Sequence, residues 1–285
     1  MINPTLRLPA DLQQRRGSAN SEHKTHMTDS GHILAFMAHP DDIEILCAGT
    51  LIHLRNKGYA IHMATMTAGD GGSMDLSGEE IARLRLKEAQ ASADLVQATY
   101  HCADEKDFVI SYQPATIKRV VEIMRICQPF LVITHPPSDY MLDHELTSQL
   151  VRNACFCAGA PNMKTEALPA APRLVGIPYL YYAAPIENKD IWGSPVRPGI
   201  AFDTTEVMNL KEAMLTCHAS QREWLMQHHG IDEFVDSMRR WSAELGKAAG
   251  VAYAEGFRQH RGHAYPRDDK LTEILADKQV EILPA

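Results

Sequence analysis

The chain has 285 residues, which is enough for one large domain or two small ones, and 45% of them are hydrophobic, as in ordinary globular proteins. Its formal net charge of −8 argues against a nucleic-acid-binding protein, because such proteins favour a basic surface. No apolar run approaches the ~20 residues that a membrane span needs, and residues 1–30 lack the apolar core of a signal peptide. We therefore expect a cytoplasmic protein that binds neither nucleic acid nor a membrane.

Residues 1–30 are polar, and we interpret them as an N-terminal extension, either a partner-binding arm or a flexible tail. After them, apolar runs typical of strands alternate with helical patterns. Strands are predicted at 33–38, 60–67 and 130–134, and helices at 44–56, 77–98, 114–127 and 145–158. Ser77 and Glu80 fit a capping box, and Pro114 suits the first position of a helix.

The second half of the chain is less regular. A loop rich in Pro and Ala is predicted at 159–178, short strands at 180–184 and 200–202, and helices at 205–229 and 232–246. The alternation in the first half implies a Rossmann-like α/β fold, with a mostly parallel sheet, helices on both faces and C-terminal helical additions. We expect one domain over residues 31–285, with its active site at the carboxyl ends of the strands.

Six cysteines occur, and none of them forms a CxxC pair. Several lie within apolar patterns, so buried free thiols in a reducing compartment are the simplest interpretation. The alternative is that Cys155 and Cys157, separated by one residue, form a metal or redox pair.

The four residues His39-Pro40-Asp41-Asp42 lie where the first predicted strand ends and a helix begins. A His and an Asp three residues apart can ligate one metal ion, which leaves Asp41 free beside it. A carboxylate in that place can act as a general base towards a water molecule that the metal activates. The alternative is that Asp41 and Asp42 only cap the following helix.

A third metal ligand should come from another strand end, since a catalytic zinc site usually has three protein ligands and one open position. Asp143-His144 supplies it, at the start of the helix that follows the strand at 130–134. His39, Asp42 and His144 would then form a set that suits zinc, although iron or another first-row metal is also compatible. Asp70 follows the second strand at the same edge, which makes it a candidate for substrate binding.

Five segments in this order resemble the signatures of LmbE-like, or PIG-L-type, deacetylases. The AHPDD(E) signature of that family is similar to 38–44, its RxxEA helix to 85–89, its HxDH segment to 136–144, its HxSQ segment to 218–221 and its EAFR ending to 254–258. These enzymes are zinc hydrolases that remove acetyl groups from substrates containing N-acetylglucosamine. The resemblance spans about residues 32–260.

The resemblance also implies roles for single residues. Those it implies as zinc ligands are His39, Asp42 and His144. Asp41 matches the general base, Arg85 a position that contacts substrate, and Asp143 an acid that supports a neighbouring catalytic His. Family members often form oligomers through the C-terminal half, so we expect a homo-oligomer.

The chain departs from the family at Met141, where the first His of HxDH would lie. A thioether can neither donate a proton nor carry positive charge. The explanation that we favour is that another group is used instead, and Tyr140 and His218 are the candidates for this catalytic role. Otherwise the metal alone polarises the carbonyl, or the chain binds its ligand without efficient catalysis.

Purely structural roles are the alternative for the residues that are not proposed metal ligands. Arg85 could pair only with a nearby acid, His218 could be a structural histidine, and the remaining histidines are expected at the surface. The leading hypothesis is a zinc-dependent hydrolase that removes an N-acetyl or other N-acyl group from an amino sugar or glycoconjugate. The alternatives are another amide or acylated metabolite as substrate, and a metal-containing carbohydrate-binding or regulatory protein.

Overall fold

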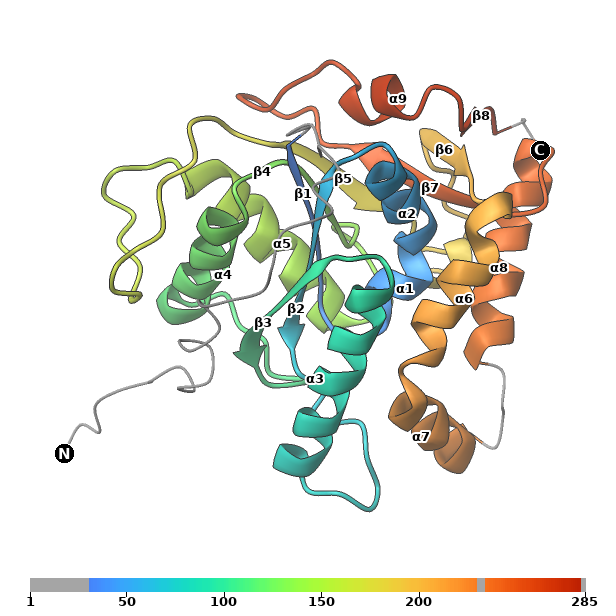
Figure 1. The fold of residues 1–285 in the computed structure, drawn as a ribbon, viewed down its shortest axis with the longest axis horizontal. Helices are drawn as coiled ribbons and strands as arrows, with labels where there is room; N and C mark the ends of the chain where they lie inside the picture. Colours follow the sequence, from blue (N-terminus) through green and yellow to red (C-terminus); the bar gives the residue numbers. More distant parts are fainter. Residues whose placement is uncertain (1–30, 230–233, 283–285) are drawn as a thin grey trace, which may run out of the picture.

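The computed structural model describes residues 31–229 and 234–282, and every named strand found there belongs to one eight-stranded sheet. The predicted extension, residues 1–30, lies outside the described residues. Across the sheet the order is β3-β2-β1-β4-β5-β7-β6-β8 (Figure 1). The strands are β1 His32–Met37, β2 Ala60–Thr67, β3 Thr99–Glu105, β4 Pro129–Thr134, β5 Tyr179–Ala183, β6 Ile200–Asp203, β7 Ala254–Gln259 and β8 Gln279–Val280.

The sheet is mostly parallel, as the sequence predicts. Strands β1 to β5 are parallel to one another, whereas β7, β6 and β8 extend the sheet beyond β5 by antiparallel pairs. The C-terminal half therefore adds strands as well as helices, and β7 and β8 were not predicted. The parallel part fixes the direction of the strands, so the loops that follow β1, β2, β3 and β4 meet at one edge.

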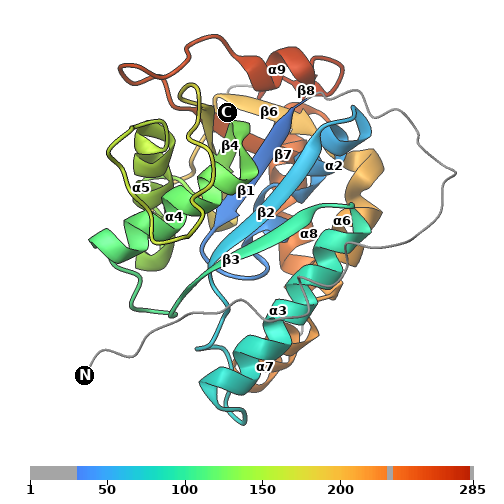
Figure 2. The same cartoon turned by 60° about the vertical axis from the view of Figure 1, so that its left-hand side comes forward.

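Helices cover both faces of the sheet (Figures 1 and 2). They are α1 Asp42–Leu46, α2 Ala48–Asn56, α3 Gly78–Leu95, α4 Pro114–Cys127, α5 Leu142–Cys157, α6 Met208–Thr216, α7 Ala219–His229, α8 Phe234–Ala249 and α9 Lys270–Ile274. Alternate residues of β1 face opposite cores. Ile33 packs in the core that includes α2, whereas Leu34 packs in the core formed with α4 and α5.

Local signals explain several element boundaries. Ser77 and Glu80 form the predicted capping box at the start of α3, and Pro114 begins α4. The helix predicted at 44–56 is interrupted at Cys47, which separates α1 from α2. The helix predicted at 205–229 is divided into a short 3-10 turn, α6 and α7, and the first two residues of the helix predicted at 232–246 lie outside the described residues.

A buried ion pair ties the C-terminal half to the first helices. Lys211 Nζ on α6 lies 2.7 Å from Glu255 Oε1 on β7, and both side chains are almost fully buried. Glu255 also accepts hydrogen bonds from the backbone N–H groups of Gly49 at 2.9 Å and Thr50 at 2.7 Å. These two groups lie in the first turn of α2, where a helix has no internal acceptor for them. A Cβ at Gly49 would lie 2.6 Å from Thr204 Cγ2, so this close approach requires glycine.

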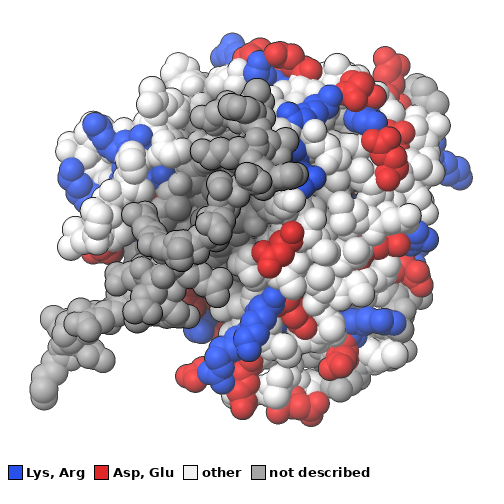
Figure 3. Space-filling model, in the orientation of Figure 1, with Lys and Arg blue, Asp and Glu red and all other residues white. Residues whose placement is uncertain are grey.

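The surface and the thiols agree with the composition. On the face seen in Figure 3, described Lys and Arg side chains are interspersed with Asp and Glu and do not form one basic area. Within 31–229 and 234–282 the structure contains no helix that is both long and apolar enough to cross a membrane. All six cysteines are free, and Cys47, Cys127 and Cys155 are buried.

Candidate active site

The loop after β1 holds Asp41 in an unusual backbone conformation. Asp41 has φ 105° and ψ −27°, and it precedes α1 without making a side-chain capping hydrogen bond. Asp42 instead turns back on the loop, where its Oδ2 accepts a hydrogen bond from the His39 backbone N–H at 2.7 Å. A positive φ at a residue with a side chain costs of order 1 kcal/mol or more and is concentrated at functional sites. The Asp41 carboxylate is therefore not used to cap the helix.

His39, Asp42 and His144 come together from three elements. His39 Nδ1 lies 3.4 Å from Asp42 Oδ2, and His144 Nε2 lies 3.5 Å from Asp42 Oδ1. One ligand atom from each of the three residues lies within 4.8 Å of the others. Two ligands held about 2.1 Å from a tetrahedral ion are about 3.4 Å apart, so the set fits one divalent cation. Their role as ligands stays a prediction, and this spacing supports it.

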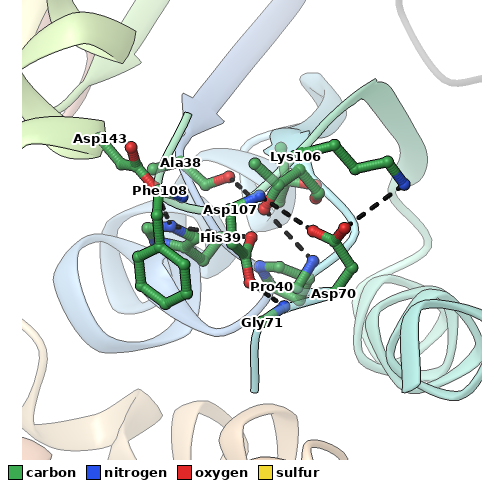
Figure 4. Close-up of polar contacts among 12 residues, drawn as sticks. Ala38, His39, Pro40, Asp70, Gly71, Lys106, Asp107, Phe108 and Asp143 are labelled. Carbon is green, nitrogen blue, oxygen red and sulfur yellow. Dashed lines mark hydrogen bonds and ion pairs between the residues drawn. The ribbon is translucent and has the colours of Figure 1, made fainter. Parts of the chain in front are cut away.

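Both histidines have a carboxylate on the ring nitrogen that faces away from Asp42. His39 Nε2 lies 3.2 Å from Asp143 Oδ2, and His144 Nδ1 lies 3.1 Å from Asp139 Oδ1. Such partners orient the rings of metal-binding histidines and make them more basic. Asp143 in turn accepts a hydrogen bond from the Phe108 backbone N–H at 2.7 Å (Figure 4).

The electrostatics of the cluster favour a cation. Burial by itself would lower the pKa of His39, but the hydrogen bonds to Asp143 and Asp42, with the charges of Asp42 and Asp107, outweigh it and raise the pKa to about 10. The carboxylates therefore stabilise positive charge at this point even though the site is buried. Together with the donor types and their spacing, this indicates that the residues fit a divalent metal.

Asp41 lies beside the cluster with its carboxylate buried. Arg85 Nη2 lies 3.6 Å from Asp41 Oδ2, and the same nitrogen donates a hydrogen bond to the Pro40 carbonyl at 2.7 Å. Burial raises the pKa of Asp41 to about 6, the Arg85 charge opposes this rise, and the neighbouring Asp42 carboxylate adds to it. A carboxyl group with a pKa near neutrality is suited to take up and return a proton. Arg85 thus holds the loop as well as bordering the cavity described below.

The sequence prediction missed His135, which was expected at the surface with the remaining histidines. That expectation is wrong, because His135 follows β4 directly and is fully buried. Its Nε2 lies 3.2 Å from Asp42 Oδ2 and accepts a hydrogen bond from the Ala38 backbone N–H at 3.0 Å. Its ring stacks on that of His144, with centroids 3.9 Å apart. The available signal was its position at the very end of a buried strand.

Asp107 and Phe108 were also missed, because they follow β3, a strand that was not predicted. Asp107 accepts a hydrogen bond from the Gly71 backbone N–H at 2.7 Å, and its other oxygen lies 4.0 Å from His39 Nε2. Asp70 serves this same loop: it accepts a hydrogen bond from the Asp107 backbone N–H at 2.9 Å and pairs with Lys106 at 3.4 Å (Figure 4). Asp70 was expected to bind substrate, yet it is not among the residues that line the cavity.

A cavity of about 490 Å³ opens above the cluster. This volume lies within the usual range for small-molecule sites. The described residues that line it are His39, Asp41, Asp42, Ile45, Gly71, Gly72, Arg85, Asp107, Phe108, Tyr140, Met141, His144, Ile186, Gln221, Trp224, Leu225, Phe234, Ser237 and Trp241. Helices α7 and α8 contribute the apolar and aromatic wall, which the sequence analysis did not identify.

The two candidates for the missing catalytic histidine lie in different places. Tyr140 lines the cavity beside Met141, with its ring edge-on to His144 at a centroid distance of 5.3 Å. His218 is fully buried, and its Nε2 lies 3.2 Å from Glu44 Oε1. His218 is not among the lining residues, so its position fits support of the loop from behind better than contact with a substrate.

Comparison with known proteins connects this geometry to a family. Residues 34–155 match the model of the family PIG-L, described as GlcNAc-PI de-N-acetylase. The matched segment contains all three proposed ligands, Asp41 and Arg85, whereas α6 to α9 and the strands after β4 lie outside it.

Similar proteins include both deacetylases and a hydratase. The chain is 26% identical to a 4-oxalmesaconate hydratase from Pseudomonas putida, over 85% of this chain and 92% of the hydratase. It is 24% identical to a 1D-myo-inositol 2-acetamido-2-deoxy-alpha-D-glucopyranoside deacetylase from Nocardia farcinica, over 68% of this chain and 81% of that protein. Among solved structures, the N,N'-diacetylchitobiose deacetylase from Pyrococcus horikoshii has a TM-score of 0.67 and 26% identity, covering 82% of this chain and 86% of the deacetylase.

Proposed function

We propose that this chain, whose residues 34–155 match the PIG-L family model, is a metal-dependent hydrolase. In this proposal it removes an N-acetyl or related N-acyl group from an amino sugar or glycoconjugate. The observation that carries the proposal is the convergence of His39, Asp42 and His144 at ligand spacing, with the Asp41 carboxylate beside them at the floor of the cavity. The names of the two deacetylase relatives give acetylated amino sugars as their substrates, which supports this substrate class.

The proposed metal ligands are His39, Asp42 and His144, and their two imidazoles and one carboxylate suit zinc. A divalent cation bound there supplies Lewis-acid polarisation of the acyl carbonyl and lowers the pKa of water. Asp143 and Asp139 keep the two imidazole rings oriented. Asp107 adds a further negative charge near His39.

Asp41 carries the proton transfers in this proposal. Its carboxylate accepts a proton from the water molecule whose oxygen attacks the acyl carbon, and the protonated carboxyl then returns the proton to the amide nitrogen as the C–N bond breaks. The products are a carboxylic acid, acetate for an N-acetyl substrate, and the free amine. Arg85 contributes by fixing the Pro40 carbonyl and so the direction of the neighbouring Asp41 side chain.

Tyr140 is our candidate for the donor that stabilises the oxyanion. Met141 lines the cavity but has no proton to donate. Tyr140 is 66% exposed and lines the cavity. A tyrosine phenol ordinarily has a pKa of about 10, so its hydroxyl is protonated near neutral pH and can donate a hydrogen bond. Hydrogen bonds to the developing oxyanion are commonly among the largest contributions to catalysis.

A hydratase is the second candidate function, because the hydratase relative matches this chain at the same identity as the chitobiose deacetylase structure. The lining of the cavity argues for the neutral amide substrate. Among the described residues that line the cavity, Arg85 is the only basic side chain other than histidine, and three lining residues are aspartates. The Arg85 guanidinium already contacts the Pro40 carbonyl and Asp41, so the lining is poorly suited to a negatively charged substrate. A carbohydrate-binding or regulatory protein without catalysis is the third candidate, and Met141 favours it.

An acetate-release screen separates these functions. Purified protein is loaded with zinc and assayed for acetate with N-acetylglucosamine conjugates and with simple N-acyl amides, and in parallel for water addition to unsaturated carboxylic acids. We expect acetate release from the amino-sugar conjugates. We also expect Asp41→Asn to abolish turnover while the metal content stays unchanged, because Asn tolerates the same backbone conformation. Water addition without acetate release would favour the hydratase, and binding without either reaction would favour the third candidate.

A further inference from the structure

Three histidines lie in a row at the edge of the sheet opposite the active site. His32 begins β1, His62 is near the start of β2, and His101 is near the start of β3. His32 pairs in register with Ala60, and His62 with Thr99, so each histidine is two residues beyond the position paired with the previous one. All three side chains therefore lie on the same face of the sheet.

That face is the one covered by α4 and α5. Leu34 and Ala64, two residues after His32 and His62, belong to the core formed with these helices. The three imidazoles thus lie on the face of the sheet that is otherwise apolar, at the end of the strands where they begin. The strands are six to eight residues long, which separates this row from the active site by about 20 Å.

The histidines contact one another directly. His32 Nδ1 lies 2.9 Å from His62 Nε2, and His62 Nδ1 lies 3.1 Å from His101 Nε2. The rings stack with centroids 5.2 and 5.3 Å apart. Within the part of the chain that the structure describes, no carboxylate pairs with any of the three, so this row differs from the acidic active site.

Cys127 adds a thiol to the row. It is the last residue of α4 and is fully buried. One ligand atom from each of His62, His101 and Cys127 lies within 4.8 Å of the others. The last turn of a helix carries partial negative charge on its free carbonyls, which favours a cation beside it.

We propose that His62, His101 and Cys127 form a second metal site, selective for a borderline ion such as zinc or cobalt. His62 Nδ1 and His101 Nε2 are already nearly at the ~3.4 Å spacing of two ligands on one tetrahedral ion. The remaining His62 nitrogen then donates to His32 Nδ1, which fixes the tautomer of the ligand. His62 and His101 are partly exposed, which leaves a path for the ion and a fourth position open to solvent.

Such a site would not depend on the proposed hydrolase activity. It joins the edge strand β3 to β2 and to the end of α4.

Cobalt titration of the full chain after treatment with a chelator tests the proposal. We expect two Co²⁺ ions per chain, together with the near-ultraviolet absorption of a cobalt–thiolate bond. Cys127→Ser should remove that absorption, whereas Cys155→Ser, which changes another buried thiol of the same core, should keep it. His62→Gln and His101→Gln should each reduce the stoichiometry from two to one, and His260→Gln should not.

The two metal sites can be distinguished in the same experiment. His144→Gln should remove the ion at the active site and leave the cobalt–thiolate absorption unchanged. One Co²⁺ per chain without the cobalt–thiolate absorption, or absorption that persists in Cys127→Ser, would overturn the second site without affecting the proposed function. If Cys127→Ser does not fold, the partly exposed His101→Gln decides the question by its stoichiometry.

Discussion

Replacing Lys211 by Met should destabilise the fold strongly, because it leaves the buried Glu255 carboxylate without its counter-charge. The two groups are 2.7 Å apart and their side chains are 0% and 2% exposed. Removing one partner of a buried pair costs about 3–5 kcal/mol. Glu255 keeps its hydrogen bonds from Gly49 and Thr50, so we expect a loss near 3 kcal/mol. At roughly 2–4 °C per kcal/mol for a chain of this size, Tm should fall by about 6–12 °C.

The control is an ion pair of equal length at the surface. Lys57 Nζ lies 2.7 Å from Asp277 Oδ1, but the two side chains are 35% and 56% exposed. Lys57→Met should therefore cost less than about 1 kcal/mol. Urea unfolding of both variants, of Glu255→Gln and of the double variant at Lys211 and Glu255 gives the coupling energy. A loss for Lys211→Met no larger than that for Lys57→Met would refute the argument from burial.

Three further predictions concern the site and its surroundings. Glu44 outweighs burial and raises the pKa of His218 above its ordinary 6.5, while His218 outweighs burial and lowers the pKa of Glu44 below 4.5. The contribution of His218 to stability is lost as pH rises through the pKa of His218 in the folded protein, and the contribution of Glu44 is lost as pH falls through the pKa of Glu44 in the folded protein. The Tm difference between wild type and His218→Gln should therefore be largest between pH 4.5 and 6.5, where both contributions are present. A difference that grows above pH 8 would contradict this pairing. Met141→His should raise kcat for acetate release by up to about 10²-fold, the lower end of what a positioned acid contributes. An unchanged kcat would mean that the site already has the proton donor it needs. Dialysis against a chelator should abolish acetate release and lower Tm, with zinc restoring both; full turnover by metal-free protein would exclude a metal-dependent reaction.

The sequence predicted those parts of the fold that have strong local signals. Strands β1, β2 and β4 are buried on both faces, so their sequences are mainly apolar and could be recognised as strands. The capping box of α3 is a local motif that marks the start of this helix. The loop from His39 to Asp42 and the segment around His144 could be found because each follows such a strand. The metal set and Asp41 were therefore accessible from sequence and resemblance.

The missed parts depend on contacts between distant segments. Strand β3 is at the edge of the sheet and has a polar, partly exposed sequence, so neither its apolarity nor its period identifies it. Asp107 and Phe108 were missed with it. His135 is a single polar residue whose burial is determined by Asp42 and Ala38, which are over 90 positions away in the chain. The aromatic wall of the cavity comes from α7, which packs against α3, and α8, which packs against β7, and these contacts cannot be predicted from the sequence patterns of the two helices.

The positive φ of Asp41 has a consequence for how this protein would change under selection. Glycine adopts such a conformation without the steric cost that a Cβ brings. Asp41→Gly would relieve this strain, but it would also leave the buried Arg85 guanidinium without the carboxylate that lies 3.6 Å away. The two effects on stability oppose each other at this position. Selection for heat resistance alone would therefore have little reason to remove the carboxylate on which the proposed reaction depends.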